Sequence, residues 1–174
     1  SWYQANYIRG FTDGSPEFIQ ADYSDKFLES LLPHLPKKST KGRVIQFWQP
    51  DCLCNRFALP HSTRSIQATS ELGYEHLTLI PSQFGDQLER LQTLNPKTKI
   101  MALDSSVLDA WPASPSVIIE GAFSQLLYIG PLGFGAFCSQ SSSSVIEQQL
   151  TKLEEPEIKP FFNVIGKGCF CPWK

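Results

Sequence analysis

Long apolar runs are missing from this sequence of 174 residues, and so is any strong excess of charge. No run of about 18 apolar residues occurs, so no segment has the composition of a membrane-spanning helix. Charged residues make up only 18% of the chain and the formal net charge is −2. These values give no reason to expect nucleic acid or a strongly charged membrane surface as a partner. The remaining composition, 41% apolar, is that of one globular domain with a substantial core.

Motifs for several common chemistries are also absent. The three histidines, His34, His61 and His76, show no metal-ligand spacing. His61, one residue past Pro60, could tune the redox potential of the cysteines, but a surface position is expected for it. No nucleophile elbow occurs, and the glycines at 130–135 lack the strand and helix that a phosphate-binding loop requires. We therefore expect no cofactor.

Methionine occurs once, at Met101, and the chain begins with Ser1. Either a shortened chain or a cleaved precursor would explain this start, and an N-terminal signal or membrane anchor would then be missing. Cysteine is odd in number, with five residues arranged as two Cys-x-Cys pairs and one single. An odd count fits a reactive thiol better than a closed framework of disulfides.

The chain is organised around residues 43–61, RVIQFWQPDCLCNRFALPH. Its apolar start, Val44–Trp48, favours a strand, and Pro50 with Asp51 indicates a turn that leads into a helix. Cys52 and Cys54 are therefore expected where a strand is followed by a helix. Partial positive charge at a helix N-terminus stabilises a thiolate, so Cys52 is a candidate nucleophile. The alternative is a pair of buried cysteines acting as small apolar side chains.

The segment FWQPDCLCNRFALP resembles the active-site segment of the thioredoxin superfamily. Phe47 and Trp48 match the end of the family's strand, Cys52 matches its nucleophilic cysteine, and Pro60 matches the proline that kinks its helix. The resemblance implies a thioredoxin-like fold and disulfide exchange with protein substrates.

Four positions depart from the family pattern. Asn55 stands where the second cysteine belongs, and Cys54 lies one place closer to Cys52. Gln46 replaces a buried acid, and Asp51 replaces a tryptophan. Residues i and i+2 of a helix do not face each other, so a Cys52–Cys54 disulfide would be strained and oxidising, or would not form. A thiolate at Cys52 could instead bond elsewhere.

Strands and helices are expected to alternate along the chain, which predicts an α/β fold with a central mixed sheet flanked by helices. The expected strands are 7–11, 44–48, 75–80, 99–103, 117–120 and 124–129, and the expected helices start at 24 or 25, then span 52–72, 82–94, 104–111 and 141–155. Strands 117–120 and 124–129 should form a hairpin around Gly121. This order resembles the TlpA-like and ResA-like periplasmic branch of the superfamily, in which a strand–helix unit within 75–111 is an insertion. In that branch a cis-proline precedes the hairpin and faces the nucleophile, and Pro115 matches it.

Three regions are expected: an N-terminal extension with a short helix at 1–42, a thioredoxin-like domain at 43–155, and a tail at 156–174. The tail has no helix or strand signal, but its aromatic residues predict that it packs on the domain. It carries Cys169 and Cys171, which could resolve a disulfide of the active site, complete a four-thiolate zinc or Cu(I) site, or form a structural bond. Cys138 is expected in the core.

We therefore expect a thiol–disulfide oxidoreductase with Cys52 as nucleophile and Cys54 as resolving or modulating thiol. Pro115, Ser114, Trp48 and Asp51 would line the groove for an extended substrate. The expected partners are protein thiols or disulfides and a redox partner protein, in the periplasm or another extracytoplasmic compartment. Membrane contact would come only from the missing anchor. The alternatives are a metal-handling module for zinc or copper and a non-catalytic protein-binding domain.

Overall fold

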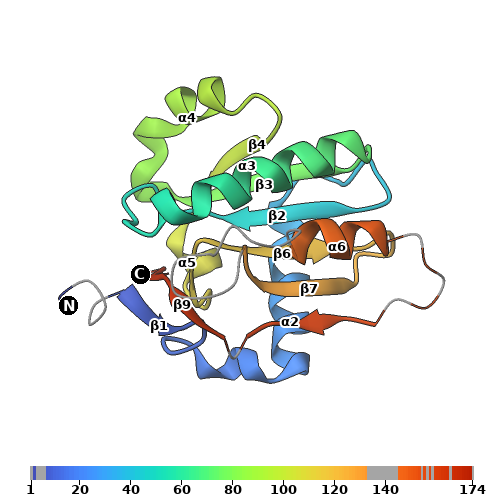
Figure 1. Cartoon of the computed structure of the whole chain (residues 1–174), viewed down its shortest axis with the longest axis horizontal. Coiled ribbons are helices and arrows are strands. Elements are labelled where there is room, and N and C mark those ends of the chain that lie inside the picture. The colour runs from blue at the N-terminus through green and yellow to red at the C-terminus, as the bar shows by residue number, and fades with distance from the viewer. Residues whose placement is uncertain are drawn as a thin grey trace.

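A six-stranded mixed sheet forms the centre of the protein, as Figure 1 shows for this computed structural model. The structure describes residue 2 and residues 7–132, 145–153, 155, 157, 159–164 and 166–173. In spatial order the strands are β4 (Lys99–Leu103), β3 (Glu75–Pro81), β2 (Arg43–Phe47), β6 (Ser116–Glu120), β7 (Leu126–Pro131) and β8 (Phe161–Phe162).

The sheet combines a parallel half with an antiparallel hairpin. Strands β2, β3 and β4 run parallel, whereas β6 is antiparallel to both β2 and β7. Strand β8 adds a parallel edge next to β7. All five residues of β2 are buried, as expected for a central strand that is covered on both faces. The register places Phe47, the last residue of β2, opposite Ser116.

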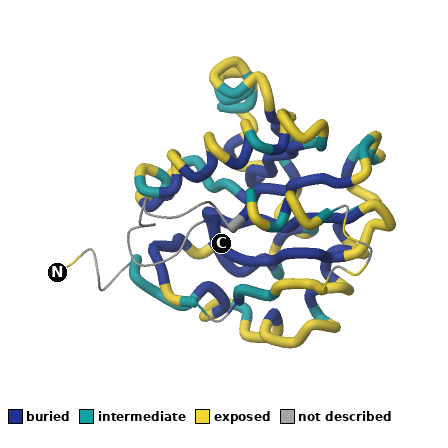
Figure 2. Tube along the Cα trace, turned by 45° about the vertical axis from the view of Figure 1, so that its right-hand side comes forward, coloured by how far each residue is buried: buried dark blue, intermediate teal, exposed yellow. Residues whose placement is uncertain are grey.

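Helices cover the two faces of the sheet because successive strand side chains point in opposite directions. Val44 belongs to a cluster on the face covered by α3 (Asn55–Glu71) and α6 (Val145–Thr151). Ile45 and Phe47 belong to the larger cluster on the other face, which includes residues of α2 (Ala21–Leu31). Figure 2 shows the resulting pattern, with buried strands inside and exposed segments on the outer helices.

The remaining short elements connect these layers. They are η1 (Pro16–Ile19), η2 (Leu32–His34), η3 (Ser82–Gln87), α4 (Leu88–Leu94) and α5 (Ser105–Leu108). Asp104 caps α5 by accepting a hydrogen bond from the Ser106 amide at 2.8 Å, and this helix is shorter than the expected 104–111. Gly73, with a φ of 74°, ends α3 in the left-handed conformation that glycine adopts without a Cβ clash.

The expected α/β fold of the thioredoxin type, with a mixed sheet flanked by helices, is confirmed by this topology. Three expectations need correction. Ser24 lies inside α2 and does not cap it, because the helix begins at Ala21 after Gln20. Segment 82–94 is a 3-10 helix followed by a short α-helix. The last helix, expected over 141–155, ends at Thr151, whereas its expected start falls among residues 133–144, which lie outside the described part of the chain.

The tail contains three short strands, contrary to the sequence expectation. Besides β8, strand β9 (Lys167–Cys169) pairs with the N-terminal β1 (Ile8–Gly10), and β10 (Cys171–Pro172) pairs with β5 (Ala113–Ser114). The tail is therefore packed on the rest of the chain by strand pairing with β7, β1 and β5. None of the described helices is long and apolar enough to cross a lipid bilayer.

Candidate functional site

The loop between β2 and α3 carries the first cysteine pair. Pro50 and Asp51 form the expected turn, in which the Cys52 amide donates to the Gln49 carbonyl at 3.0 Å. The chain then needs a further turn before the helix begins, and the Asn55 amide donates to the Cys52 carbonyl at 3.1 Å.

The helix begins later than the sequence indicates. Asn55 is the first residue of α3 and Cys54 occupies its N-cap position, so Cys52 lies just before the helix. The Cys54 carbonyl accepts hydrogen bonds from the amides of Phe57 at 3.0 Å and Ala58 at 3.2 Å. The expectation that Cys52 itself starts the helix is therefore wrong, because α3 starts three residues later, and the N-terminal dipole acts most directly on Cys54.

Asn55, which replaces the family's second cysteine, fixes the cysteine loop. Its side-chain Nδ2 donates to the Gln49 carbonyl at 2.8 Å and lies 3.4 Å from the Pro50 carbonyl. The amide thus holds the start of the loop against the start of the helix, which a thiol could not do with comparable hydrogen bonds.

Ser114 joins the cysteine loop to the opposite segment. Its hydroxyl accepts a hydrogen bond from the Gln49 amide at 2.8 Å and donates to the Phe47 carbonyl at 3.3 Å. Its own carbonyl oxygen lies 3.7 Å from the Cys52 Sγ. The Ser114–Pro115 peptide bond is cis, as the family resemblance implies. The segment before the hairpin therefore lies directly beside the Cys52 sulfur.

Two disulfides connect this loop to the tail. Cys52 is bonded to Cys171 and Cys54 is bonded to Cys169, with sequence separations of 119 and 115 residues. The two Cys-x-Cys segments therefore run antiparallel, and the two disulfides between them are adjacent. The Sγ atoms of Cys52, Cys54 and Cys171 all lie within 4.8 Å of one another.

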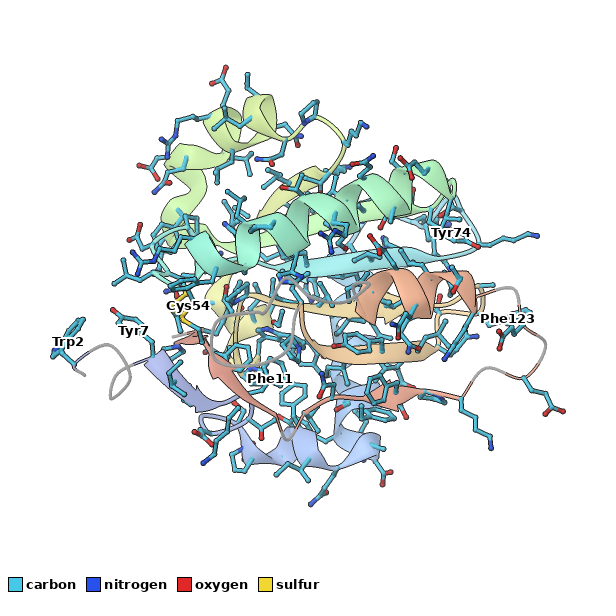
Figure 3. All side chains as sticks on the ribbon, viewed as in Figure 1. Trp2, Tyr7, Phe11, Cys54, Tyr74 and Phe123 are labelled. Atoms are coloured by element: carbon cyan, nitrogen blue, oxygen red, sulfur yellow. A yellow bond between two sulfur atoms is a disulfide. The ribbon has the colours of Figure 1, made fainter. Side chains whose placement is uncertain are left out.

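The four cysteines of the two disulfides are all buried, but not equally. Cys54 is 0% exposed and Cys169 is 2% exposed, whereas Cys52 and Cys171 are 5% and 6% exposed. The side chains of Tyr7, Ile8 and Phe57 pack against this cluster. Figure 3 shows Cys54 near Tyr7, at one edge of the molecule. The Cys52–Cys171 bond is therefore the one closer to solvent.

Other predicted site residues are spread around this cluster. Trp48 is half-buried and packs against two clusters, one beside α3 and one beside α4, and Asp51 is exposed in the turn. Cys138 lies outside the described residues. His61, expected at the surface, is only 5% exposed, because α3 turns it inward.

The sequence analysis did not identify Trp173 and Trp111 as residues of the site. Trp173 is 5% exposed and its ring lies edge-on to Phe47, with 5.8 Å between ring centroids. Trp111 stacks on Phe47 at 3.6 Å and its Nε1 donates to the Ala113 carbonyl at 2.9 Å. The only sequence signal for these two residues is that they are aromatic and lie near the tail cysteines and Pro115.

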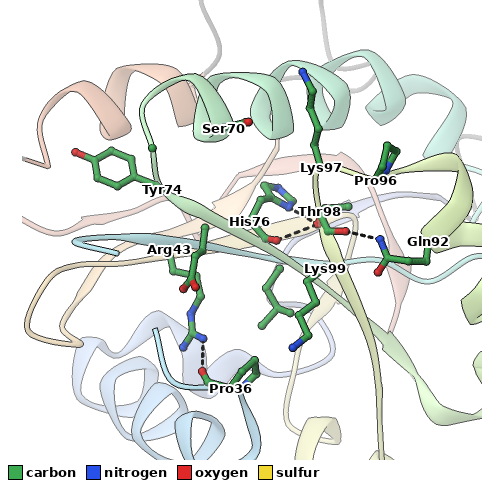
Figure 4. A pocket seen from close by; sticks show the side chains of 13 residues that line it. Pro36, Arg43, Ser70, Tyr74, His76, Gln92, Pro96, Lys97, Thr98 and Lys99 are labelled. Carbon is green, nitrogen blue, oxygen red and sulfur yellow. Dashed lines mark hydrogen bonds between the residues drawn. The ribbon is translucent and has the colours of Figure 1, made fainter. Parts of the chain in front are cut away.

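A hollow of about 530 Å³ lies at the other end of the parallel strands, and Figure 4 shows its lining. Arg43 and His76 contribute to it from the starts of β2 and β3, whereas the cysteines follow the end of β2. Burial lowers the pKa of His76 to about 3, and its Nδ1 lies 2.6 Å from the Thr98 Oγ1. This histidine is thus neutral and part of the packing, far from the disulfides.

Comparisons with known proteins found one matching family and several proteins of similar structure. The model of the family described as "Domain of unknown function (DUF6436)" matches residues 20–173. No curated protein has a sequence that matches this chain. An uncharacterized conserved protein from Geobacillus kaustophilus has a similar structure, with a TM-score of 0.61 and 14% identity over 79% of this chain and 78% of that one.

Two further solved structures are similar over different lengths. A hypothetical protein from Sinorhizobium meliloti 1021 aligns with a TM-score of 0.56 and 10% identity, over 86% of this chain and 82% of the other. The solution structure of a thiol:disulfide interchange protein from Bacteroides sp. aligns with a TM-score of 0.41 and 12% identity, over 49% of this chain and 61% of that one. The fold assignment rests on the sheet topology and not on these identities.

Proposed function

The chain belongs to the DUF6436 family, a domain family of unknown function, and we propose that this member exchanges disulfides with protein thiols. The observation that carries the proposal is the Cys52–Cys171 disulfide beside Ser114. There an extended segment pairs with the backbone of Ser114 while its cysteine is bonded to Cys52. An intermediate of disulfide exchange has the same components, a docked segment and a mixed disulfide.

The exchange begins with a thiolate of a partner dithiol. It attacks the Cys52 Sγ, forms a mixed disulfide with Cys52 and releases the Cys171 thiolate. The partner's second thiolate then attacks the partner's first sulfur, which is bonded to Cys52, and releases the Cys52 thiolate. The partner leaves with a disulfide, and Cys52 and Cys171 hold the two electrons it has lost. The reverse sequence reduces a partner disulfide.

Cys52 is assigned as the exchanging sulfur for two reasons. Its bond with Cys171 is less buried than the bond between Cys54 and Cys169. Its Sγ lies 3.7 Å from the carbonyl oxygen of Ser114, whose backbone pairs with the extended segment, so the Cys52 sulfur lies next to the strand edge at which a substrate would dock. Two observations support Cys54 as the modulating thiol: it lies at the N-cap of α3, and its Sγ is within 4.8 Å of the Cys52 Sγ.

An oxidising compartment suits this chemistry, since disulfides persist outside the cytoplasm and are reduced within it. We therefore propose that the protein works in the periplasm or an equivalent compartment. Its partners would be secreted proteins and a redox protein that resets the disulfide.

An oxidative refolding assay tests the proposal. The oxidised protein is added to a reduced, unfolded enzyme that needs disulfides for activity, and the rate at which activity returns is measured. The wild type should accelerate recovery, and the Cys52→Ser/Cys171→Ser variant should return the rate to background. Cys138→Ser is the matched control and should keep the wild-type rate. A wild type that fails both to oxidise and, once reduced, to reduce test proteins would contradict the proposal and favour a non-catalytic binding domain.

A second candidate function is metal binding by the reduced protein. The three sulfurs within 4.8 Å of one another, with Cys169 bonded to one of them, support it. Four thiolates around zinc at Zn–S distances of about 2.3 Å would lie about 3.8 Å apart, a small movement from this arrangement. Soft thiolates would also hold Cu(I).

Metal titration of the anaerobically reduced protein separates the two functions. A metal-handling module should bind one zinc or copper ion per chain with sub-micromolar affinity and lose it when Cys54 and Cys169 are replaced by serine. Weak, non-stoichiometric binding would contradict this second function. Disulfide exchange by the metal-free oxidised protein would support the first.

A further inference from the structure

We propose that the groove beside Cys52 selects protein segments in which a large aromatic residue follows the reacting cysteine by two positions. This inference rests on the proposed disulfide exchange and specifies its substrate class. The protein's own tail is the template, since Cys171 and Trp173 hold these two positions in the structure.

Strand pairing sets the register of the docked segment. Cys171 pairs with Ser114 and Pro172 pairs with Ala113, in antiparallel orientation. A peptide that adds a strand to such an edge gains affinity from backbone hydrogen bonds and specificity from the pockets that receive alternate side chains. Residues two positions apart point to the same side of a strand, so Cys171 and Trp173 both face inward. Pro172, between them, is exposed.

The site that receives Trp173 is built from the protein core. Trp173 belongs to the cluster that contains Phe47, Leu103 and Leu108, and its ring meets Phe47 edge-on. Beside it lies a hollow of about 250 Å³, lined by Pro81, Gln83, Leu103, Ser105, Leu108, Asp109 and Trp173. In Figure 1 the C-terminal end lies next to α5, which supplies Leu108 to this site. A buried aromatic anchor of this kind carries a large share of the binding energy in peptide recognition.

The last residues of the tail must leave the groove before a partner segment can dock in it. Exchange at Cys52 releases Cys171 but leaves the Cys54–Cys169 bond intact, so the last residues of the chain can leave the groove while the rest stays attached. The partner then supplies its own cysteine and aromatic residue to the vacated positions. The tail therefore competes with the substrates it resembles.

The test compares two peptides on two full-length variants. Both variants carry Cys171→Ser and Cys138→Ser, which leaves a thiol on Cys52 and keeps the Cys54–Cys169 bond. One retains Trp173 and the other carries Trp173→Ala. The Cys52 thiol is first converted to a mixed disulfide with glutathione. The peptide acetyl-GFCPWK-amide or acetyl-GFCPAK-amide then displaces glutathione, and intact-mass spectrometry gives the equilibrium constant of that exchange.

In the Trp173→Ala variant the tryptophan peptide should be favoured over the alanine peptide by about ten-fold or more, because the indole fills the vacated site. In the variant that retains Trp173 the preference should fall below about three-fold, because the chain's own indole competes. Equal constants for the two peptides in the Trp173→Ala variant would overturn the proposal. Circular dichroism checks folding, and Trp173→Leu replaces Trp173→Ala if the latter does not fold.

A measurement without thiol chemistry separates this proposal from the proposed function. The peptides acetyl-GFSPWK-amide and acetyl-GFSPAK-amide are added to the Trp173→Ala variant, and the shift in its unfolding temperature is recorded. A shift with the tryptophan peptide alone supports the aromatic site, even if neither cysteine peptide exchanges at Cys52. In that case the disulfide-exchange function would fail while the site would stand. Equal shifts, or none, would count against the aromatic site itself.

Discussion

The two disulfides should contribute to stability non-additively, because they close the same loop. The Cys52–Cys171 bond closes a loop with a sequence separation of 119 residues, which the chain-entropy relation converts to about 5 kcal/mol. Once it is formed, the Cys54–Cys169 bond closes only a small ring made of the two Cys-x-Cys segments. A ring of about six residues corresponds to about 2 kcal/mol by the same relation.

Serine replacements make this difference measurable. Removing either bond alone, with Cys54→Ser/Cys169→Ser or with Cys52→Ser/Cys171→Ser, should lower the free energy of unfolding by about 2 kcal/mol. Removing both should lower it by about 7 kcal/mol. Urea unfolding at equilibrium measures each value, with Cys138→Ser in every variant to prevent thiol exchange.

The alternative pairing predicts a different loss of unfolding free energy. Bonds within each Cys-x-Cys pair would close only two rings of about three residues, so removing all four cysteines would cost about 3 kcal/mol. A measured loss near that value, in place of one near 7 kcal/mol, would refute the inter-segment pairing and with it the closed tail.

Three further predictions concern the surrounding framework. Asn55→Ala should lower stability by about 1 kcal/mol in urea unfolding, because the side-chain hydrogen bond to the Gln49 carbonyl is lost. His76 has a folded-state pKa of about 3 against 6.5 in the unfolded chain, so the unfolded chain binds a proton first as the pH falls. The free energy of unfolding is therefore unaffected by this group above pH 6.5 and decreases below it. At pH 5 the loss should be about 2 kcal/mol, and His76→Asn should remove that dependence from the stability–pH curve. Glu120→Gln should cost about 3 kcal/mol in urea unfolding, because the Arg43 guanidinium, 2.7 Å from the Glu120 carboxylate, remains charged and buried.

The main sheet was predictable because its strands are apolar, short and bounded by turn residues. Strand β4 has the predicted bounds, Lys99–Leu103, since Asn95 and Pro96 end the preceding helix and Asp104 caps the next one. The family resemblance added the cis peptide bond at Pro115, which no local pattern reveals. Local signals and motif spacing therefore accounted for the main sheet except its edge strand β8, and for the position of the cysteine loop.

The tail and the cysteine pairing could not be predicted in the same way. Strands β9 and β10 have three and two residues, too few for a periodic pattern, and their partners lie more than a hundred and about sixty residues away. Four cysteines allow three pairings, and sequence alone does not choose among them. The start of α3 was misplaced because Pro50 and Asp51 form a complete turn before Asn55 can begin the helix.

The order in which the disulfides react is the most direct test of the exchange mechanism. The oxidised protein is treated with one equivalent of a dithiol and quenched with an alkylating agent, and mass spectrometry then identifies the modified cysteines. Cys52 and Cys171 should be alkylated first, while Cys54 and Cys169 remain bonded, because the former pair is nearer to solvent. Alkylation of Cys54 and Cys169 first, with Cys52 still bonded to Cys171, would contradict the assignment of Cys52 as the exchanging sulfur.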